Sequence, residues 1–132
     1  MILELAAAVA LAKAQPACAV TKPVLPSGHY GAKRLWTILP ANGVIRARSA
    51  PDGSLGWKLA WIPDTWRGDL TVRGRRLDAS GKMRVHAVNW GYSSTGKGSW
   101  ASAVTFPAAG CYRLTGSSAG TTLTYVVQVV PS

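Results

Sequence analysis

From residue 34 onward the chain consists of short runs rich in β-branched and aromatic residues, separated by Gly, Pro, Asn-Gly and Asp-Gly. Runs that recur roughly every 8–12 residues, with turn signals between them, are typical of an all-β sandwich or barrel. No run in this part shows the helical period of about 3.6 residues. The strands predicted in this way span 34–39, 43–48, 56–62, 69–73, 75–78, 82–88, 100–105, 111–115 and 121–130.

The last run, 121–130, alternates most clearly between apolar and polar positions. Its polar positions are Thr and Gln, but Val126 and Val130 interrupt them. We therefore expect one face in the core and the opposite face partly covered. The positions expected in the core are Leu123, Tyr125, Val127 and Val129.

The run 82–88 also alternates, and residues 79–81 (ASG) suit a three-residue hairpin loop that joins it to the run before. This register sets Leu77 opposite Met83 and Asp78 opposite Lys82, and it sets Arg76 opposite Arg84 on the solvent side. The side chains expected to face inward are Met83, Val85 and Ala87.

The first 14 residues resemble a signal peptide. Residues 5–12 are wholly apolar but too short to cross a bilayer, and 12–14 (AKA) form a small-x-small cleavage site. Glu4 and the lack of any Lys or Arg before it depart from this pattern. A helix packed on the domain and a truncated longer signal remain alternatives. The predicted organisation is a leader at 1–14, an extended lead-in at 15–33 and one β-sandwich domain at 34–132.

Cys18 and Cys111 are the only two cysteines. An even pair in an exported chain predicts one disulfide. Closing so long a loop destabilises the unfolded state by about 4–5 kcal/mol in the chain-entropy model. The alternative is a lipoprotein with Cys18 acylated, but Gln-Pro-Ala before Cys18 is a poor lipobox and Cys111 would stay unpaired. We expect the disulfide.

The charge balance narrows the class of partner. The chain of 132 residues carries 15 Lys and Arg against 5 Asp and Glu, a net charge of +10 that favours anionic partners. Five of these cations fall between residues 73 and 84, and they form either an anion-binding patch or a solvated face with counterions. Nucleic acid is disfavoured, because no aromatic ladder accompanies them and export argues against it. The five are Arg73, Arg75, Arg76, Lys82 and Arg84.

The six tryptophans divide into two groups. Trp57 and Trp61 share a predicted strand face and Trp36 lies in another strand, so we expect them in the core. The second group lies in or beside the Gly/Ser-rich stretch 89–99 and other loops, where rings either stack on sugars or pack beneath the loop. This group, a candidate ligand platform, is Trp66, Trp90, Tyr92 and Trp100.

No pattern of catalytic residues stands out. His29 and His86 have no second histidine or carboxylate at ligand spacing, and neither a G-x-S-x-G elbow nor an HExxH helix is present. We therefore expect no catalytic site, no metal and no cofactor. The aspartates in turn or strand-edge positions are interpreted as turn caps: Asp52, Asp64, Asp69 and Asp78.

The C-terminal part of the chain resembles a group of small uncharacterised exported bacterial proteins. Residues 106–116 read FPAAGCYRLTG and are followed by LTYVV at 123–127, and the group ends in a similar phrase before an apolar strand. Further matching stretches are CAVTKP at 18–23, LWT at 35–37, DGSLG at 52–56 and GRRLD at 74–78. The resemblance implies an immunoglobulin-like sandwich in an exported protein, and it implies no activity.

Together these observations predict an all-β, immunoglobulin-like β-sandwich of about seven to nine strands. We expect a secreted or periplasmic, non-enzymatic binding module that recognises an anionic polymer or polysaccharide through the arginines and the loop aromatics. Two alternatives stay open: an assembly protein that associates with itself or with a cell-envelope complex, and a small hydrolase.

Overall fold

The computed structural model describes residues 18–65, 68–94 and 96–132, and this part of the chain is all-β. The predicted leader and Trp66 therefore lie outside the described residues. A 3-10 turn, η1, spans Ala41–Gly43. The strands are β1 (His29–Ala32), β2 (Leu35–Ile38), β3 (Val44–Ser49), β4 (Leu55–Pro63), β5 (Thr71–Arg76), β6 (Arg84–Tyr92), β7 (Gly98–Phe106), β8 (Gly110–Ser118) and β9 (Thr121–Pro131).

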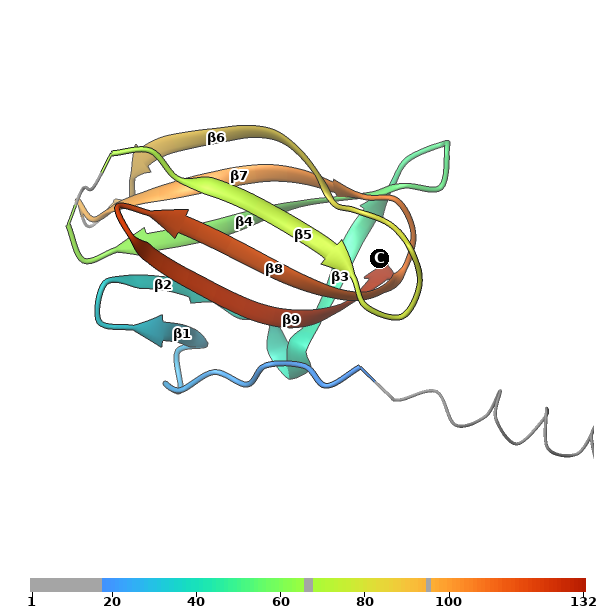
Figure 1. The fold of residues 1–132 in the computed structure, drawn as a ribbon, viewed down its shortest axis with the longest axis horizontal. Helices are drawn as coiled ribbons and strands as arrows, with labels where there is room; N and C mark the ends of the chain where they lie inside the picture. The colour runs from blue at the N-terminus through green and yellow to red at the C-terminus, as the bar shows by residue number, and fades with distance from the viewer. Residues whose placement is uncertain (1–17, 66–67, 95) are drawn as a thin grey trace, which may run out of the picture.

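The strands form two groups that share β3. In the first group, β4 pairs with β7 and β7 with β6, while the β1–β2 hairpin pairs with the end of β4. In the second, β5 pairs with β8 and β8 with β9. β3 runs parallel to β9 through Val44–Ala47 and then pairs antiparallel with β4 through Arg48 and Ser49. Figure 1 shows the two groups, with β3 crossing from one to the other.

This pairing is the strand order of an immunoglobulin constant-type sandwich. The strands β3, β4, β7 and β6 take the places of A, B, E and D, and β5, β8 and β9 take those of C, F and G. The predicted immunoglobulin-like sandwich is confirmed, and the β1–β2 hairpin is an addition to it.

The core lies between the two groups of strands. Trp61 is fully buried, and its indole N–H donates to the Ser102 hydroxyl at 3.0 Å. A Cβ at position 116 would lie 2.5 Å from the Trp61 ring, so only Gly116 leaves room for this indole. The four core positions predicted on the last strand are all buried, and Val126 and Val130 opposite them are half-buried, as expected.

The connection from β7 to β8 is closed by Tyr112. Its hydroxyl donates to the Ala108 carbonyl at 2.7 Å, and its ring packs against Phe106 with 4.8 Å between centroids. A tyrosine near the start of strand F that bonds the preceding corner is a hallmark of this sandwich. The feature pins the two sheets together at this end.

The N-terminal segment is joined to β8 by a disulfide and to β9 by hydrogen bonds. Cys18 and Cys111 form the predicted disulfide, with 5.5 Å between their Cα atoms. The Thr21 N–H donates to the Val126 carbonyl at 2.9 Å, and the Val126 N–H donates to the Thr21 hydroxyl at 2.8 Å. Residues 18–21 thus cover the stretch of β9 that lies before its pairing with β3.

Three predicted boundaries are wrong. Residues 69–73 and 75–78 contribute to one strand, β5, and β1 lies in the segment expected to be an extended lead-in. The stretch 89–99 was expected to be a loop because of its Gly and Ser content, but β6 continues to Tyr92 and β7 begins at Gly98. Two buried or half-buried tryptophans opposite each other keep these strands paired.

The predicted hairpin register between β5 and β6 is also wrong. Arg75, not Asp78, pairs with Lys82, and the Met83 N–H donates to the Gly74 carbonyl at 3.0 Å. The turn is longer than expected because the Leu77 N–H donates to the Cys111 carbonyl, 2.7 Å away, instead of continuing the hairpin. Arg76 and Arg84 therefore do not face each other.

The prediction that Met83, Val85 and Ala87 face inward is confirmed only in part. Met83 is buried, but Val85 is 37% exposed because β6 is an edge strand. A β-bulge between Val85 and Ala87 then adds one residue and reverses the alternation. Ala87 pairs with Ala103 on the outer face, and Val88 turns toward the core beside the buried Ser102.

Candidate anion-binding surfaces

The structure separates the five cations of the predicted cluster into three places. Arg73, Arg75 and Lys82 lie together on the outer face of β5 and its hairpin. Arg76 pairs with the carboxylate of Asp78, and Arg84 lies on the other group of strands, where it is opposite Thr105. Only the first three form a common surface.

A fourth cation completes this surface. Arg113 on β8 lies directly opposite Arg75, and Thr115 lies opposite Arg73. Directly paired residues share one face of a sheet, and all four arginine and lysine side chains are exposed. We refer to Arg73, Arg75, Lys82 and Arg113 as the β5–β8 basic face. Together with Gly74 and Thr115 they line a depression of about 400 Å³.

The electrostatics of the β5–β8 basic face are unbalanced. None of the residues that line the depression is acidic. Like charges directly opposite each other on a sheet are destabilising, and here Arg75 faces Arg113. Guanidinium groups present paired N–H donors that match carboxylate, sulfate or phosphate, so an anion in the depression would relieve this repulsion.

Arg113 was missed by the sequence reasoning. The alternation of the run 111–115 places it on the outer face, since Tyr112 and Leu114 are both buried. What the sequence does not reveal is that β8, and not the next strand in the chain, is the neighbour of β5.

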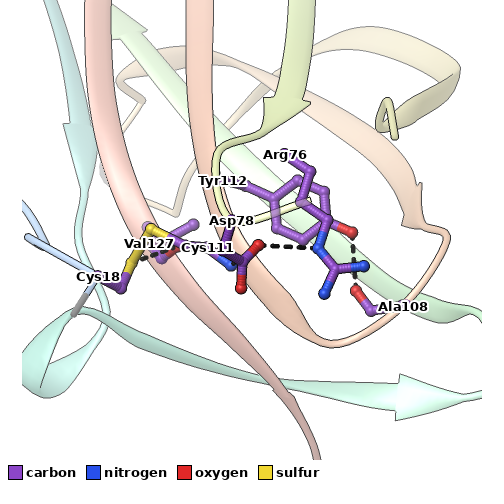
Figure 2. Close-up of polar contacts among 7 residues, drawn as sticks. All are labelled: Cys18, Arg76, Asp78, Ala108, Cys111, Tyr112 and Val127. Atoms are coloured by element: carbon purple, nitrogen blue, oxygen red, sulfur yellow. Dashed lines mark hydrogen bonds and ion pairs between the residues drawn. A yellow bond between two sulfur atoms is a disulfide. The ribbon is translucent and has the colours of Figure 1, made fainter. Parts of the chain in front are cut away.

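Arg76 is part of the architecture. Its Nε donates to the Asp78 carboxylate at 2.8 Å, and the same carboxylate oxygen accepts the Cys111 N–H at 3.2 Å (Figure 2). The hydrogen bond from Arg76, followed by the one from the Cys111 N–H, lowers the pKa of the Asp78 carboxyl. A Cβ at Gly110 would lie 2.5 Å from the Arg76 Nε, so any larger residue at this position would displace the pair. The Arg76 side chain is only 22% exposed.

Arg84 belongs to a different row of residues. The register places Arg84, Thr105, Gly56 and Arg48 in line across β6, β7, β4 and β3. His86 Nε2 lies 2.5 Å from the Thr105 hydroxyl oxygen, at the bulge. This row has an arginine at each end and small residues between them.

Asp52 lies in the β3–β4 turn. Its carboxylate accepts the Ser54 hydroxyl at 2.6 Å and the Ser54 N–H at 3.0 Å. These hydrogen bonds lower the pKa of Asp52, and the charge of Arg84 adds a smaller effect. The role of Asp52 is the turn cap predicted from the sequence.

The aromatic residues of the predicted platform occupy different depths. Trp90, Trp100 and Trp61 lie opposite one another across β6, β7 and β4, with 5.1 Å between the Trp90 and Trp100 rings. Trp100 is 3% exposed and Trp90 is half-buried, whereas Tyr92 is 73% exposed and stands edge-on to Trp90. Among these described residues, Tyr92 alone presents a largely open ring.

Two further observations concern the described ranges 18–65, 68–94 and 96–132. No group of three or more His, Cys, Asp or Glu side chains is placed to hold a metal ion there. No helix in those ranges is both long enough and apolar enough to cross a membrane.

The class that the fold and surface define is an immunoglobulin-like sandwich with a disulfide-anchored N-terminal segment and an unbalanced basic face. Comparison of the chain with protein-family models, with curated proteins and with solved structures found no match.

Proposed function

We propose that this protein is a non-enzymatic module that binds anionic polymers through the β5–β8 basic face. The observation that carries the proposal is the direct pairing of Arg75 with Arg113, with Arg73 and Lys82 beside them and no acidic residue lining the depression. Like charges held opposite each other on paired strands cost the folded protein free energy unless an anion compensates them.

The net charge of +10 supports a polymeric rather than a small anion. A cationic protein attracts a polyanion from a distance, and each neutralised site releases a counterion from the polymer. The polymer is the partner class that uses both the local cluster and the overall charge.

A secreted or periplasmic location is part of the proposal. The Cys18–Cys111 disulfide supports it, because structural disulfides persist in oxidising compartments. The resemblance of residues 106–116 to a phrase in small exported bacterial proteins points the same way.

Elution from a heparin column tests the proposal. The double variant Arg75→Gln/Arg113→Gln should elute at clearly lower salt than the wild type. The matched control is Arg34→Gln/Lys97→Gln, which removes the same charge from two exposed residues that do not line the depression. Equal shifts for the two variants would show that only net charge matters and would contradict a defined binding face.

A further inference from the structure

A second basic surface lies in the other group of strands, where β3 pairs with β4. A broad open groove of about 860 Å³ runs there, within the range of ligand sites. The side chains that matter are Arg46 and Arg48 from β3, Trp57 and Lys58 from β4, and Thr105 from β7. None of the residues that line the groove is acidic.

Small residues contribute part of the groove lining, among them Gly56, Ala103 and Thr105. Gly56 pairs with Thr105, and Lys58 pairs with Ala103. Arg48 is the partner of Gly56 on the other side. Gly56 and Ala103 therefore offer little steric obstruction to a chain that enters the groove, and cations are part of the same lining.

Trp57 is exposed for a reason that lies in the topology. Strand alternation puts it on the same face as Leu59 and Trp61, both of which are buried. However, the pairing of β3 with β4 covers only residues 55 and 56, and the pairing with β2 begins at residue 61. Trp57 lies in the gap between them and is 39% exposed. It also lines a smaller slot of about 240 Å³ with Ile45 and Tyr125.

The chemistry of the groove combines two features that few ligands satisfy together. An indole presents a large flat apolar surface that packs on a sugar ring, with an N–H for a hydroxyl. The guanidinium groups of Arg46 and Arg48 match a carboxylate or sulfate in a bidentate way, and Lys58 adds a point charge. A neutral sugar leaves the cations unused, and a chain of phosphates has no ring for Trp57.

We infer that this groove is a second site, for an acidic polysaccharide whose pyranose rings carry carboxylate or sulfate groups. The inference rests on the proposed function, since it names the chemistry of the polymer that the basic protein would bind. It assigns ring recognition to Trp57 and charge recognition to the residues beside it.

Titration calorimetry with three probes tests the inference: an oligogalacturonate, a dextran of matched length and linear inorganic polyphosphate. The wild type should bind the oligogalacturonate and not the dextran. Trp57→Ala should weaken oligogalacturonate binding roughly tenfold and leave polyphosphate binding unchanged. Val24→Ala, which removes another exposed apolar side chain that does not line the groove, is the control and should bind as the wild type does.

Two further variants show whether weaker binding by Trp57→Ala comes from the loss of the ring or from a loss of folding. Arg48→Gln/Lys58→Gln alters only exposed side chains and should also weaken oligogalacturonate binding, while Trp57→Phe keeps a ring and should retain most of it. If Trp57→Ala and Arg48→Gln/Lys58→Gln both bind oligogalacturonate like the wild type, the groove inference is wrong. If the wild type binds neither polyphosphate nor oligogalacturonate, the proposed function itself fails.

Discussion

The Tyr112 hydroxyl donates a hydrogen bond to the Ala108 carbonyl, 2.7 Å away and four residues earlier in the chain. This bond closes the connection between β7 and β8. Tyr112 directly follows Cys111, whose sulfur anchors the N-terminal segment. The same short region therefore fixes the strand corner, the disulfide and, through the Cys111 N–H, the Asp78 carboxylate that holds Arg76 (Figure 2).

Replacing Tyr112 by Phe should destabilise the protein by about 1–2 kcal/mol, because a carbonyl in the corner loses its partner. Urea unfolding measures the change. Tyr92→Phe removes the hydroxyl of an exposed tyrosine and should leave the midpoint unchanged. Equal midpoints for Tyr112→Phe and the wild type would show that the corner bond contributes nothing.

Stability should fall in alkali. Burial raises the pKa of Tyr112 and of Tyr125 above the ordinary value of 10.0. Above that value the unfolded chain loses these protons before the folded protein does, so the free energy of unfolding decreases as pH rises. Unfolding by urea at a series of pH values measures the slope. Tyr112→Phe should make the slope shallower, and a flat profile between pH about 9 and about 11 would contradict the account.

The variant Cys18→Ser/Cys111→Ser should lose about 2–5 kcal/mol of stability, because the disulfide closes a long loop and restricts the unfolded chain. Thermal and urea melts of the variant and the wild type measure this loss. Peptide mapping without reduction should show the Cys18–Cys111 cross-link in wild-type protein recovered from an oxidising compartment. Two free thiols there would overturn the assignment.

Arg76 and Arg75 are adjacent in the chain and should behave in opposite ways. Arg76→Gln breaks the contact with Asp78 and should lower stability, with little change in heparin elution. Arg75→Gln removes a like-charge contact and should hold stability or raise it by a few tenths of a kcal/mol, while elution moves to lower salt. Paired urea melts and column runs compare them. Equal changes in stability and in elution for the two variants would show that Arg75 and Arg76 have the same role, which contradicts the account.

Part of this architecture is readable from the sequence because it depends on local pattern. The buried face of β9 follows from the apolar residues at every second position, and the disulfide follows from the cysteine count. The all-β fold class follows from the spacing of turn residues. These features need no knowledge of which strands are neighbours.

The candidate sites depend on long-range pairing, which local pattern does not specify. Arg113 joins the basic face only because β8 lies beside β5, and Trp57 is exposed only because β3 and β2 leave a gap along β4. The turn after Arg76 departs from a tight hairpin because Leu77 bonds Cys111 on a different strand. The bulge before Ala87 likewise has no signal in the alternation of apolar residues.

The salt dependence of polyphosphate binding tests the central claim most directly. Each contact between a cation and a phosphate contributes about 0.7–0.9 to the slope of log K against log salt concentration. The variant Arg75→Gln/Arg113→Gln should therefore show a slope flatter than the wild type by about 1.5, while Arg34→Gln/Lys97→Gln should keep the wild-type slope. Equal slopes for the two variants would show that Arg75 and Arg113 do not contact the polymer, and the β5–β8 basic face would not be a binding site.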